Sequence, residues 1–394
     1  MKKVLIPRVR FKGFDEEWKK DTIRNIANIT NGKLDANAMV KSGMYNFYTS
    51  GIDVYKIDKY SFEGEGISIA GNGVNMGYMH LVSGKYNAYQ RTYILNNIKI
   101  DRHFLFYNLW KNFWEFCQKN TREGSIPYLL YNDISDFKIF KSHSNEQQKI
   151  GKLLENIDNL ISLEEIKLNK LKQLKKTLLQ KMFPEGNSKT PRIRFKGFDE
   201  EWKEEKLEEV GQTYTGLSGK TKKDFGHGNS RYITYLNIFN NPIANLKGLD
   251  RIEEDCKQNS VKYGDIFVTT SSEIPEEVGI TSIWPFKDKE NIYLNSFCFG
   301  IRLNNINNYY INFLAYNLRN NELRKDIVLL AQGISRFNIS NRRFMKLNIL
   351  LPNISEQQKI GDFFCKIDTL INLYNSKLNK LRQIKEALLQ KMFV

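Results

Sequence analysis

The stretch SNEQQKIGKLLENIDNLISLEEIKLNKLKQLKKTLLQKMF, residues 144–183, decides how this chain is organised, because it occurs twice. Residues 354–393 read ISEQQKIGDFFCKIDTLINLYNSKLNKLRQIKEALLQKMF, and 24 of the 40 positions are identical at an offset of 210 residues. A second repeat opens each half: residues 7–20 read PRVRFKGFDEEWKK and residues 191–204 read PRIRFKGFDEEWKE, with 12 of 14 positions identical. The chain therefore consists of two halves with the same beginning and the same end.

Both closing segments are predicted to be long helices whose apolar residues form a narrow seam typical of a coiled-coil strand. Asn145 with Gln148, and Ser355 with Gln358, have the spacing of a capping box at the helix start. Two such seams in one chain pair most simply with each other, because internal pairing costs less ordering entropy; the alternative is pairing between two chains. The predicted seam residues are Ile157, Leu160, Ile161, Leu168, Leu171, Leu174 and Leu178 in the first helix, and Ile367, Leu370, Ile371, Leu378, Leu381, Ile384 and Leu388 in the second.

The residues between the repeats differ between the halves and indicate mixed α/β domains. Short stretches in which apolar and polar residues alternate predict strands; examples are EGISIAGNGVNMGYMHLV, GDIFVTTSS and RYITYLNIF. Two stretches with helical spacing of apolar residues predict helices, RHFLFYNLWKNFWEFCQKN and NYYINFLAYNLRNNELRKDIV. The fold class is therefore α+β: two α/β domains, each followed by a long helix. The predicted boundaries are a first domain at 1–143, a helix at 144–183, a linker at 184–190, a second domain at 191–353 and a helix at 354–394. Trp18 and Trp202 of the openings are expected to pack inside their domains.

Composition points to a polyanionic partner, either nucleic acid or an anionic membrane surface. The chain has 394 residues, 60 Lys and Arg against 44 Asp and Glu, and a net charge of +16, part of which reflects a Lys-rich and Asn-rich composition. The four cysteines form no CxxC pair, which argues against a disulfide framework or a structural zinc site. No stretch approaches the ~20 apolar residues of a membrane helix, so a soluble, cytoplasmic protein without membrane contact is expected.

The familiar catalytic and cofactor-binding motifs are absent from the sequence or incomplete. GNGVNMG (71–77) has the wrong glycine spacing for a dinucleotide loop and predicts a hairpin, and GLSGKT (216–221) lacks a glycine of the phosphate-binding loop. There is no Asn-Pro-Pro-aromatic motif of an adenine methyltransferase, no HExxH and no GxSxG. These absences predict a binding protein with no catalytic, cofactor-binding or metal-binding residues of its own.

Basic, amide and hydroxyl side chains in turn-rich stretches are the candidates for DNA reading, since such side chains bind base edges and phosphates. For any one of them, an ordinary solvated loop is an equally good interpretation, so the prediction depends on the whole set. The candidates are Asn72, Asn75, Gln90, Arg91, Arg122 and Ser125 in the first domain, and Thr270, Ser271, Ser272, Gln332, Ser335, Arg336 and Asn338 in the second.

The whole layout resembles the specificity subunits of type I restriction–modification systems. The paired FKGFDEEWK openings, the paired EQQKIG helix starts and the LLQKMF endings carry this resemblance, together with GSIPYL (124–129) and GISRFNI (333–339). No single motif decides it, whereas their duplicated order over nearly the entire chain is highly specific.

The resemblance implies that each divergent block is a target-recognition domain that reads one half of a bipartite, asymmetric site on double-stranded DNA. The two helices would form an antiparallel coiled coil with pseudo-twofold symmetry that sets the distance between the halves. Two methyltransferase subunits carrying S-adenosylmethionine would methylate adenine N6, and restriction subunits would add ATP- and Mg-dependent cleavage. The chain itself would be non-catalytic. Two alternatives stay open at this point: a DNA methyltransferase or nuclease acting alone, and a coiled-coil scaffold without DNA contact.

Overall fold

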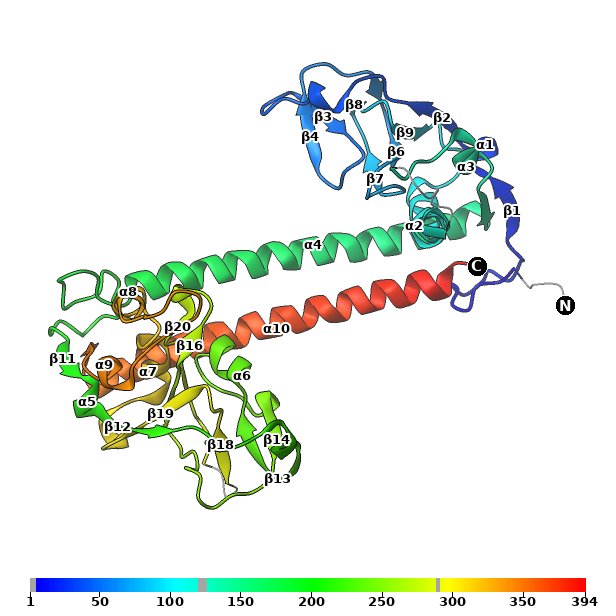
Figure 1. Cartoon of the computed structure of the whole chain (residues 1–394). Coiled ribbons are helices and arrows are strands. Elements are labelled where there is room, and N and C mark those ends of the chain that lie inside the picture. Colours follow the sequence, from blue (N-terminus) through cyan, green and yellow to red (C-terminus); the bar gives the residue numbers. More distant parts are fainter. Residues whose placement is uncertain (1–4, 120–125, 288–290) are drawn as a thin grey trace. The chain divides into compact units, whose positions relative to one another are not determined.

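The chain folds into two compact units, seen in a computed structural model that describes residues 5–119, 126–287 and 291–394 (Figure 1). Unit 1 combines Met1–Ile166 with Asn375–Val394, and unit 2 is Lys167–Tyr374. Each unit therefore holds one recognition-type domain together with parts of both long helices.

The helices of the described residues include the two long ones expected from the repeats. The α-helices are α1 (Ile23–Ile26), α2 (Arg102–Lys119), α3 (Tyr131–Ser135), α4 (Ser144–Lys181), α5 (Leu207–Val210), α6 (Tyr235–Asn240), α7 (Ile311–Asn317), α8 (Asn321–Leu329), α9 (Asn341–Phe344) and α10 (Ile354–Met392). The 3-10 turns are η1 (Ala36–Ala38), η2 (Lys222–Asp224), η3 (Leu246–Gly248), η4 (Pro275–Glu277) and η5 (Ile306–Asn308).

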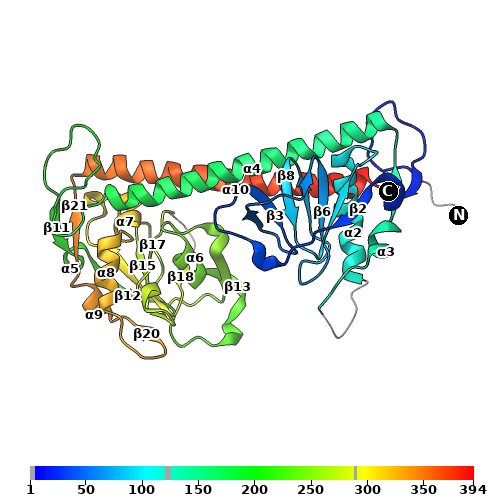
Figure 2. The same ribbon diagram turned by 90° about the horizontal axis from the view of Figure 1, so that it is seen from above.

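Unit 1 is built on an antiparallel sheet of order β2-β9-β6-β7, beside a second sheet β4-β3-β8-β5 and the pair β1-β10. The helix α2 contacts β6 and β7, and it lies beside the sheet that contains β2 and β6 (Figure 2). The strands of unit 1 are β1 (Lys19–Thr22), β2 (Asn28–Asn31), β3 (Tyr45–Tyr48), β4 (Val54–Ile57), β5 (Phe62–Glu63), β6 (Gly66–Ala70), β7 (Met79–Val82), β8 (Lys85–Ala88), β9 (Thr92–Asn96) and β10 (Lys138–Lys141).

Unit 2 repeats this topology although its sequence differs. Its antiparallel sheet has the order β12-β19-β15-β17, with a second sheet β14-β13-β18 and the pairs β11-β21 and β16-β20. In both units the second sheet contains one parallel and one antiparallel neighbour of the same strand, β3 in unit 1 and β13 in unit 2. The strands of unit 2 are β11 (Lys203–Lys206), β12 (Gly211–Thr215), β13 (Phe225–Ile233), β14 (Leu249–Ile252), β15 (Ile266–Thr269), β16 (Ser271–Ser272), β17 (Thr281–Ile283), β18 (Ile292–Leu294), β19 (Cys298–Leu303), β20 (Phe337–Asn338) and β21 (Asn348–Leu351).

Local polar caps explain two places where the elements differ from those predicted. Residues 231–239 were expected to form one strand, but the side chain of Thr234 accepts a hydrogen bond from the Asn237 N–H and starts α6. The single helix expected around residues 308–328 is instead α7 and α8, because the side chain of Asn320 caps α8 through the Leu323 N–H (2.9 Å). Short polar side chains favour caps over helix continuation.

The long helices α4 and α10 pair as an antiparallel coiled coil, visible within each unit in Figure 1. In unit 1, Lys385 lies 2.6 Å from Asp158 and Lys377 lies 3.1 Å from Glu164, so residue numbers fall along α10 as they rise along α4. In unit 2, Lys175 forms the corresponding ion pair with Asp368. The pairing is internal to one chain, as the entropy argument favoured.

Most of the predicted seam residues are at least partly buried, and four are not. Leu168, Ile367 and Leu378 are buried, whereas Ile157, Ile161, Leu171, Leu178, Ile371, Leu381 and Leu388 are half-buried. Leu160, Leu174, Leu370 and Ile384 are exposed, so their assignment to the seam is wrong. The Lys–Asp and Lys–Glu pairs named above occupy part of the helix–helix contact, and these three leucines and one isoleucine lie on a more exposed face.

The predicted capping boxes are also wrong. The helices begin at Ser144 and Ile354, so Asn145 and Ser355 lie inside them. The cap of α10 is Asn353, whose side chain accepts a hydrogen bond from the Glu356 N–H (3.0 Å).

The repeated EQQKIG segments make the same contacts in both units. Glu146 is fully buried and binds the guanidinium of Arg10 through two oxygens, at 2.7 and 2.9 Å. Glu356 is equally buried and binds Arg194 at 2.7 and 2.8 Å. The helix start thus anchors the repeated opening, and Trp18 and Trp202 are buried as expected.

One glutamine and the glycine of each EQQKIG segment bring the long helix into close contact with the domain that precedes it. The side-chain oxygen of Gln147 accepts the Asp101 N–H (3.2 Å), and that of Gln357 accepts the Tyr310 N–H (2.9 Å). A Cβ on Gly151 would lie 2.4 Å from an Asp101 carboxylate oxygen, and one on Gly361 would lie 2.6 Å from the Phe313 nitrogen. Only glycine allows this approach at either junction.

Each domain core is completed by the end of the other half's helix. Phe393, just after α10, packs against Trp18 and Phe104 in unit 1, with ring centroids 6.0 and 5.3 Å away. Phe183, just after α4, packs against Trp202 and Phe313 in unit 2 at 6.0 and 5.8 Å. The repeated LLQKMF endings therefore have a packing role as well as a helical one.

Within the described ranges of the chain, no helix is both long enough and apolar enough to cross a membrane.

Candidate nucleic-acid interface

The candidate residues of unit 2 converge on one short β-ribbon. Ser271 and Ser272 form β16, which pairs with β20 so that Ser271 faces Asn338. Asn338 also exchanges backbone hydrogen bonds with Gln332 at 2.8 and 2.9 Å. The ribbon and its returning loop bring together all seven candidates of this domain: Thr270, Ser271, Ser272, Gln332, Ser335, Arg336 and Asn338.

The returning loop needs glycine at one position. Gly333 has φ +140°, and a Cβ there would lie 2.1 Å from the carbonyl oxygen of Arg336. The tight loop leaves Gln332, Ser335, Arg336 and Asn338 exposed to solvent. Amide, hydroxyl and guanidinium groups therefore lie at the surface on a backbone fixed by the ribbon.

Several of these candidates already have partners inside the protein. The hydroxyl of Thr270 donates to the Phe297 carbonyl oxygen (2.8 Å), and that of Ser272 donates to Glu277 (3.2 Å). The guanidinium of Arg336 donates to the Ser271 hydroxyl oxygen (3.3 Å) and lies over the Phe297 ring at 5.6 Å. Arg336 is thus held in place while it remains exposed.

Unit 1 builds the equivalent arrangement from different residues. Asn72 bridges to Tyr128, and the Gly71 carbonyl oxygen accepts the Leu129 N–H (2.7 Å), as the Thr270 carbonyl oxygen accepts the Ile339 N–H (2.9 Å) in unit 2. Asn72 also accepts a hydrogen bond from the Ser50 hydroxyl (2.5 Å). The strand end after β6 therefore matches the strand end after β15.

The remaining candidates of unit 1 lie beside this loop. Asn75 is half-buried in the β6–β7 connection, which is the hairpin expected for GNGVNMG. The Gly71 N–H donates to the Arg91 carbonyl oxygen (2.8 Å), which places the exposed Arg91 and its neighbour Gln90 at the adjacent β8–β9 turn. Gln90 donates to Asp35 (2.7 Å).

Arg122 and Ser125 lie outside the described residues. The DNA-reading role of the whole candidate set stays a prediction, as do the proposed domain boundaries.

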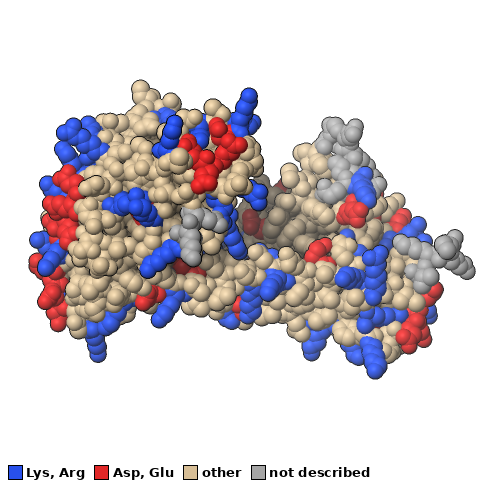
Figure 3. All heavy atoms as spheres, turned by 90° about the horizontal axis from the view of Figure 1, so that it is seen from below, with Lys and Arg blue, Asp and Glu red and all other residues tan. Residues whose placement is uncertain are grey.

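Positive charge is widespread on the surface. Figure 3 shows Lys and Arg spread across the face in view on both units, whereas Asp and Glu gather in a few places. This distribution accords with the net charge of +16 and suits a polyanion contacted over a broad area.

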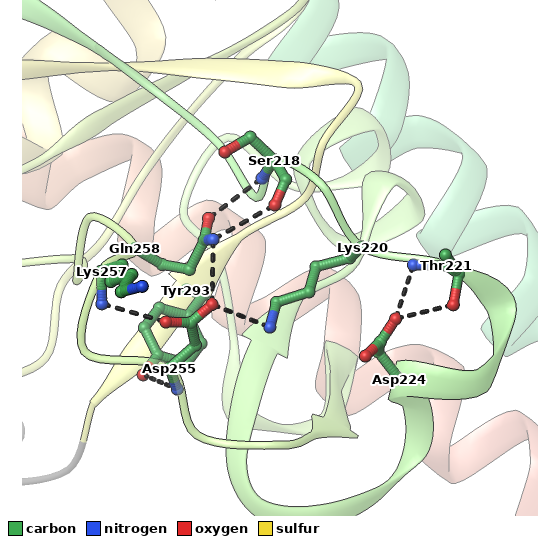
Figure 4. Close-up of polar contacts among 8 residues, drawn as sticks. All are labelled: Ser218, Lys220, Thr221, Asp224, Asp255, Lys257, Gln258 and Tyr293. Carbon is green, nitrogen blue, oxygen red and sulfur yellow. Dashed lines mark hydrogen bonds and ion pairs between the residues drawn. The ribbon is translucent and has the colours of Figure 1, made fainter.

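The GLSGKT segment is held by protein side chains (Figure 4). Lys220 lies 2.9 Å from the carboxylate of Asp255, and Gln258 bonds both the N–H and the carbonyl oxygen of Ser218 at 3.0 and 3.1 Å. The hydrogen bond from Lys220 lowers the pKa of Asp255 to about 2. The next element is the three-residue η2 turn, so the helix start of a phosphate-binding loop is absent from this described segment.

Two arginines that were not selected from the sequence fix the surroundings of the ribbon. Arg319 donates to the carbonyl oxygens of Ile238 (2.6 Å) and Asn241 (3.1 Å) at the end of α6, and burial lowers its pKa to about 9. Arg324 donates to the carbonyl oxygens of Glu276 and Val278, both at 2.8 Å, around η4. Nothing in the polar stretch NLRNNELRKD (317–326) distinguishes these two arginines from ordinary surface arginines, so the sequence contains no signal for their role.

A matching polar triad ties each domain to both long helices. In unit 1 the Tyr107 hydroxyl donates to Asp158 of α4 (2.7 Å), and Asp158 pairs with Lys385 of α10. In unit 2 the Tyr316 hydroxyl donates to Asp368 of α10 (2.8 Å), and Asp368 pairs with Lys175 of α4. Burial, together with the adjacent carboxylate, raises the pKa of both tyrosines.

The duplicated geometry agrees with the comparison to known families. Residues 15–173 and 199–383 both match the family described as the type I restriction modification DNA specificity domain. The chain belongs to this type I specificity-subunit family.

Individual specificity subunits are similar at low to moderate identity. The subunit of the type I restriction enzyme EcoDI of Escherichia coli is 31% identical over 164 residues, which is 42% of this chain and 36% of that protein. A putative type I specificity subunit of Mycoplasma genitalium is 23% identical over 397 residues. This alignment covers 95% of this chain and 94% of that protein. The chain thus matches only about a third of the E. coli relative but nearly all of the M. genitalium one.

A solved structure shares the fold of this specificity subunit. The crystal structure of a type I restriction–modification S subunit from M. genitalium aligns with a TM-score of 0.68 at 18% identity, covering 99% of both chains. The two chains therefore share the arrangement of two mixed α/β domains and two long helices over nearly their full lengths.

Proposed function

We propose that this specificity subunit reads a bipartite, asymmetric site on double-stranded DNA, one half with each unit. It directs adenine-N6 methylation, or restriction, by partner subunits. The observation that carries this proposal is the polar surface at the matching strand end of each unit, formed by the β16–β20 ribbon in unit 2 and beside the Asn72–Tyr128 bridge in unit 1. Its polar residues differ between units, whereas the junctions that support it are the same.

The difference between these two polar surfaces supports an asymmetric site. Unit 1 presents Asn72, Gln90 and Arg91, whereas unit 2 presents Gln332, Arg336 and Asn338. Asn and Gln are suited to adenine and Arg to guanine in the major groove. Two readers of different composition recognise two different half-sites, and the paired helices set the spacer between them.

Exposed apolar side chains on the long helices support docking of two methyltransferase subunits. Leu160 and Leu163 of α4 are 37% and 49% exposed, and their repeat counterparts Leu370 and Leu373 of α10 are 46% and 60% exposed. Exposed apolar groups that recur at equivalent positions favour two copies of the same helical partner. Leu160 and Leu370 are two of the residues that were wrongly assigned to the coiled-coil seam. Leu163 and Leu373 lie three residues further along the same helices.

The chemistry would belong to the partners. The methyltransferase subunits would carry S-adenosylmethionine, restriction subunits would use ATP and Mg, and the present chain would act without a cofactor in the cytoplasm. The incomplete motifs GNGVNMG and GLSGKT support this division, since one is a hairpin and the other is held by Asp255 and Gln258.

Mapping of methylated adenines tests the proposal. A host that expresses the methyltransferase partner is sequenced for adenine methylation with and without this gene. A bipartite motif that depends on the gene is the expected result. Transfer of a labelled methyl group by the purified chain alone would instead establish an enzyme that acts by itself.

A further inference from the structure

An apolar groove lies beside the ribbon of unit 2. Its apolar side chains come from three separate segments: Leu236 and Phe239 from α6, Ile274 from the start of η4, and Phe297 from the β18–β19 connection. Leu236, Ile274 and Phe297 are 65%, 48% and 53% exposed. Large apolar side chains that gather at a surface mark a binding site more often than scattered ones do.

The walls of the groove are fixed before anything binds. The Tyr235 hydroxyl donates to the Ser271 carbonyl oxygen (3.1 Å), which ties α6 to the ribbon. Arg319 holds the end of α6 and Arg324 holds η4 through the carbonyl contacts described above. The Phe297 N–H donates to the side chain of Asn295 (2.8 Å). A preformed surface of this kind binds without a large ordering cost.

The groove and the ribbon form one continuous surface. Ser271, Ser272 and Arg336 of the ribbon also line the groove, and the guanidinium of Arg336 lies over the Phe297 ring. A DNA duplex that presents base edges to Arg336 therefore presents the neighbouring base edges to the groove. Glu273 is exposed at the same surface, and a carboxylate there disfavours a phosphate.

We propose that this groove receives the 5-methyl group of a thymine in the half-site read by unit 2. The inference rests on the proposed function. Among the groups that base pairs present in the major groove, the thymine methyl is the apolar one, and it is read by apolar side chains. The adjacent Arg336 and Glu273 are suited to the guanine and cytosine edges of a neighbouring pair.

Uracil substitution tests the groove without changing base pairing. The chain, assembled with its methyltransferase partner, is titrated with duplexes that carry the mapped site, in which each thymine of the unit 2 half is replaced in turn by uracil. At one position we expect the affinity to fall about fourfold, the effect of burying one methyl group. The double variant Leu236→Ser, Ile274→Ser should bind thymine and uracil duplexes equally.

The matched control is Leu246→Ser. Leu246 is 45% exposed on η3 of the same unit and does not line the groove, so its variant should discriminate thymine from uracil as the parent does. Both variants change exposed residues, so folding is retained.

Three outcomes would overturn the inference. They are a unit 2 half-site without thymine, equal affinity of the parent for thymine and uracil at every position, or a double variant that loses methyltransferase assembly while it still discriminates. The last result would make the groove a protein-docking surface. Absence of any site-specific binding by the parent complex would instead refute the proposed function itself.

Discussion

Arg336 is the residue whose position best suits it to base reading. It is exposed, yet its guanidinium contacts the Ser271 hydroxyl and lies over Phe297. An arginine held in this way can present its remaining donors to guanine O6 and N7 at little entropic cost.

Replacing Arg336 with alanine should relax one position of the unit 2 half-site. The expected loss of affinity for the preferred base is about 1–3 kcal/mol, with little change for other bases at that position. Competition binding with single-base variants of the site measures this. Arg342→Ala, a change at an exposed arginine on α9, is the control and should not alter the base preference at that position. Uniform weakening on all sequences by Arg336→Ala would mark a phosphate contact and contradict base reading.

The Lys220–Asp255 pair predicts a pH dependence. Because the folded-state pKa of Asp255 is lowered to about 2 from its usual 3.8, the pair contributes its full stabilisation above pH 4. The contribution is lost as the pH falls through the folded-state value. In Lys220→Met the pKa of Asp255 should rise toward its usual value, as an NMR titration of the carboxyl carbon would show. Lys222→Met serves as the control, and an unchanged pKa in Lys220→Met would refute the assigned cause.

At the scale of single residues, the sequence located the polar candidates for DNA reading but not the groove beside them. Gln332, Ser335 and Arg336 lie in one turn-rich stretch, so their residue types and spacing were visible without a structure. Leu236 and Phe297 are 61 positions apart and are brought together only by the packing of α6. Each of them alone is an ordinary apolar residue in a sequence pattern.

The elements that connect the domains are two helices with two different apolar faces. Leu171 and Leu381 belong to the half-buried face, and Leu171 packs against the core of unit 2. Leu163 and Leu373 belong to the exposed face. A Leu→Asp substitution is therefore expected to lower stability on the half-buried face and to weaken partner binding on the exposed face.

Changing Leu171 and Leu381 to Asp should destabilise the folded chain, because each change places a charge without a partner in a helix–helix contact. We expect roughly 2–3 kcal/mol for each substitution in denaturant unfolding. The matched double variant Leu163→Asp, Leu373→Asp should unfold like the parent but should weaken assembly with the methyltransferase. An undiminished stability of the first variant would argue against the internal coiled coil.

The helix ends predict that each core depends on the other half's helix. Phe393→Ala should lower hydrogen-exchange protection in unit 1, and Phe183→Ala should lower it in unit 2, since each removes a buried ring at a cost of about 3–5 kcal/mol. Leu174→Ala, at an exposed position of α4, is the control. The observed packing would be contradicted if Phe393→Ala lowered protection in unit 2 and not in unit 1, or if Phe183→Ala lowered it in unit 1 and not in unit 2.

Periodicity predicted the long helices and their pairing, but not their caps or which domain core each helix end completes. The i, i+3 and i+4 pattern located α4 and α10 and most of the seam. It could not separate Leu160 and Leu174 from the seam, because the apolar stripe is wider than the contact. It also could not assign Phe183 and Phe393 to opposite cores, since identical LLQKMF endings carry no information about which domain receives them.

Across the whole molecule, identical junctions support two different readers. The Arg–Glu pair, the Gln contact and the glycine approach occur in both units with matching geometry. The readers differ in sequence, in the second sheet and in the residues they expose. Separation of this kind predicts that one reader can be exchanged without disturbing the other.

If each unit reads its own half-site, exchanging the first recognition domain should change only one half of the recognised sequence. Residues 21–143 are replaced by the corresponding block of a related specificity subunit, and the methylated adenines of the resulting strain are mapped by sequencing. We expect one half of the bipartite motif to change, while the other half and the spacer length stay as they were. A change in both halves together would contradict this expectation and would require a single composite DNA surface.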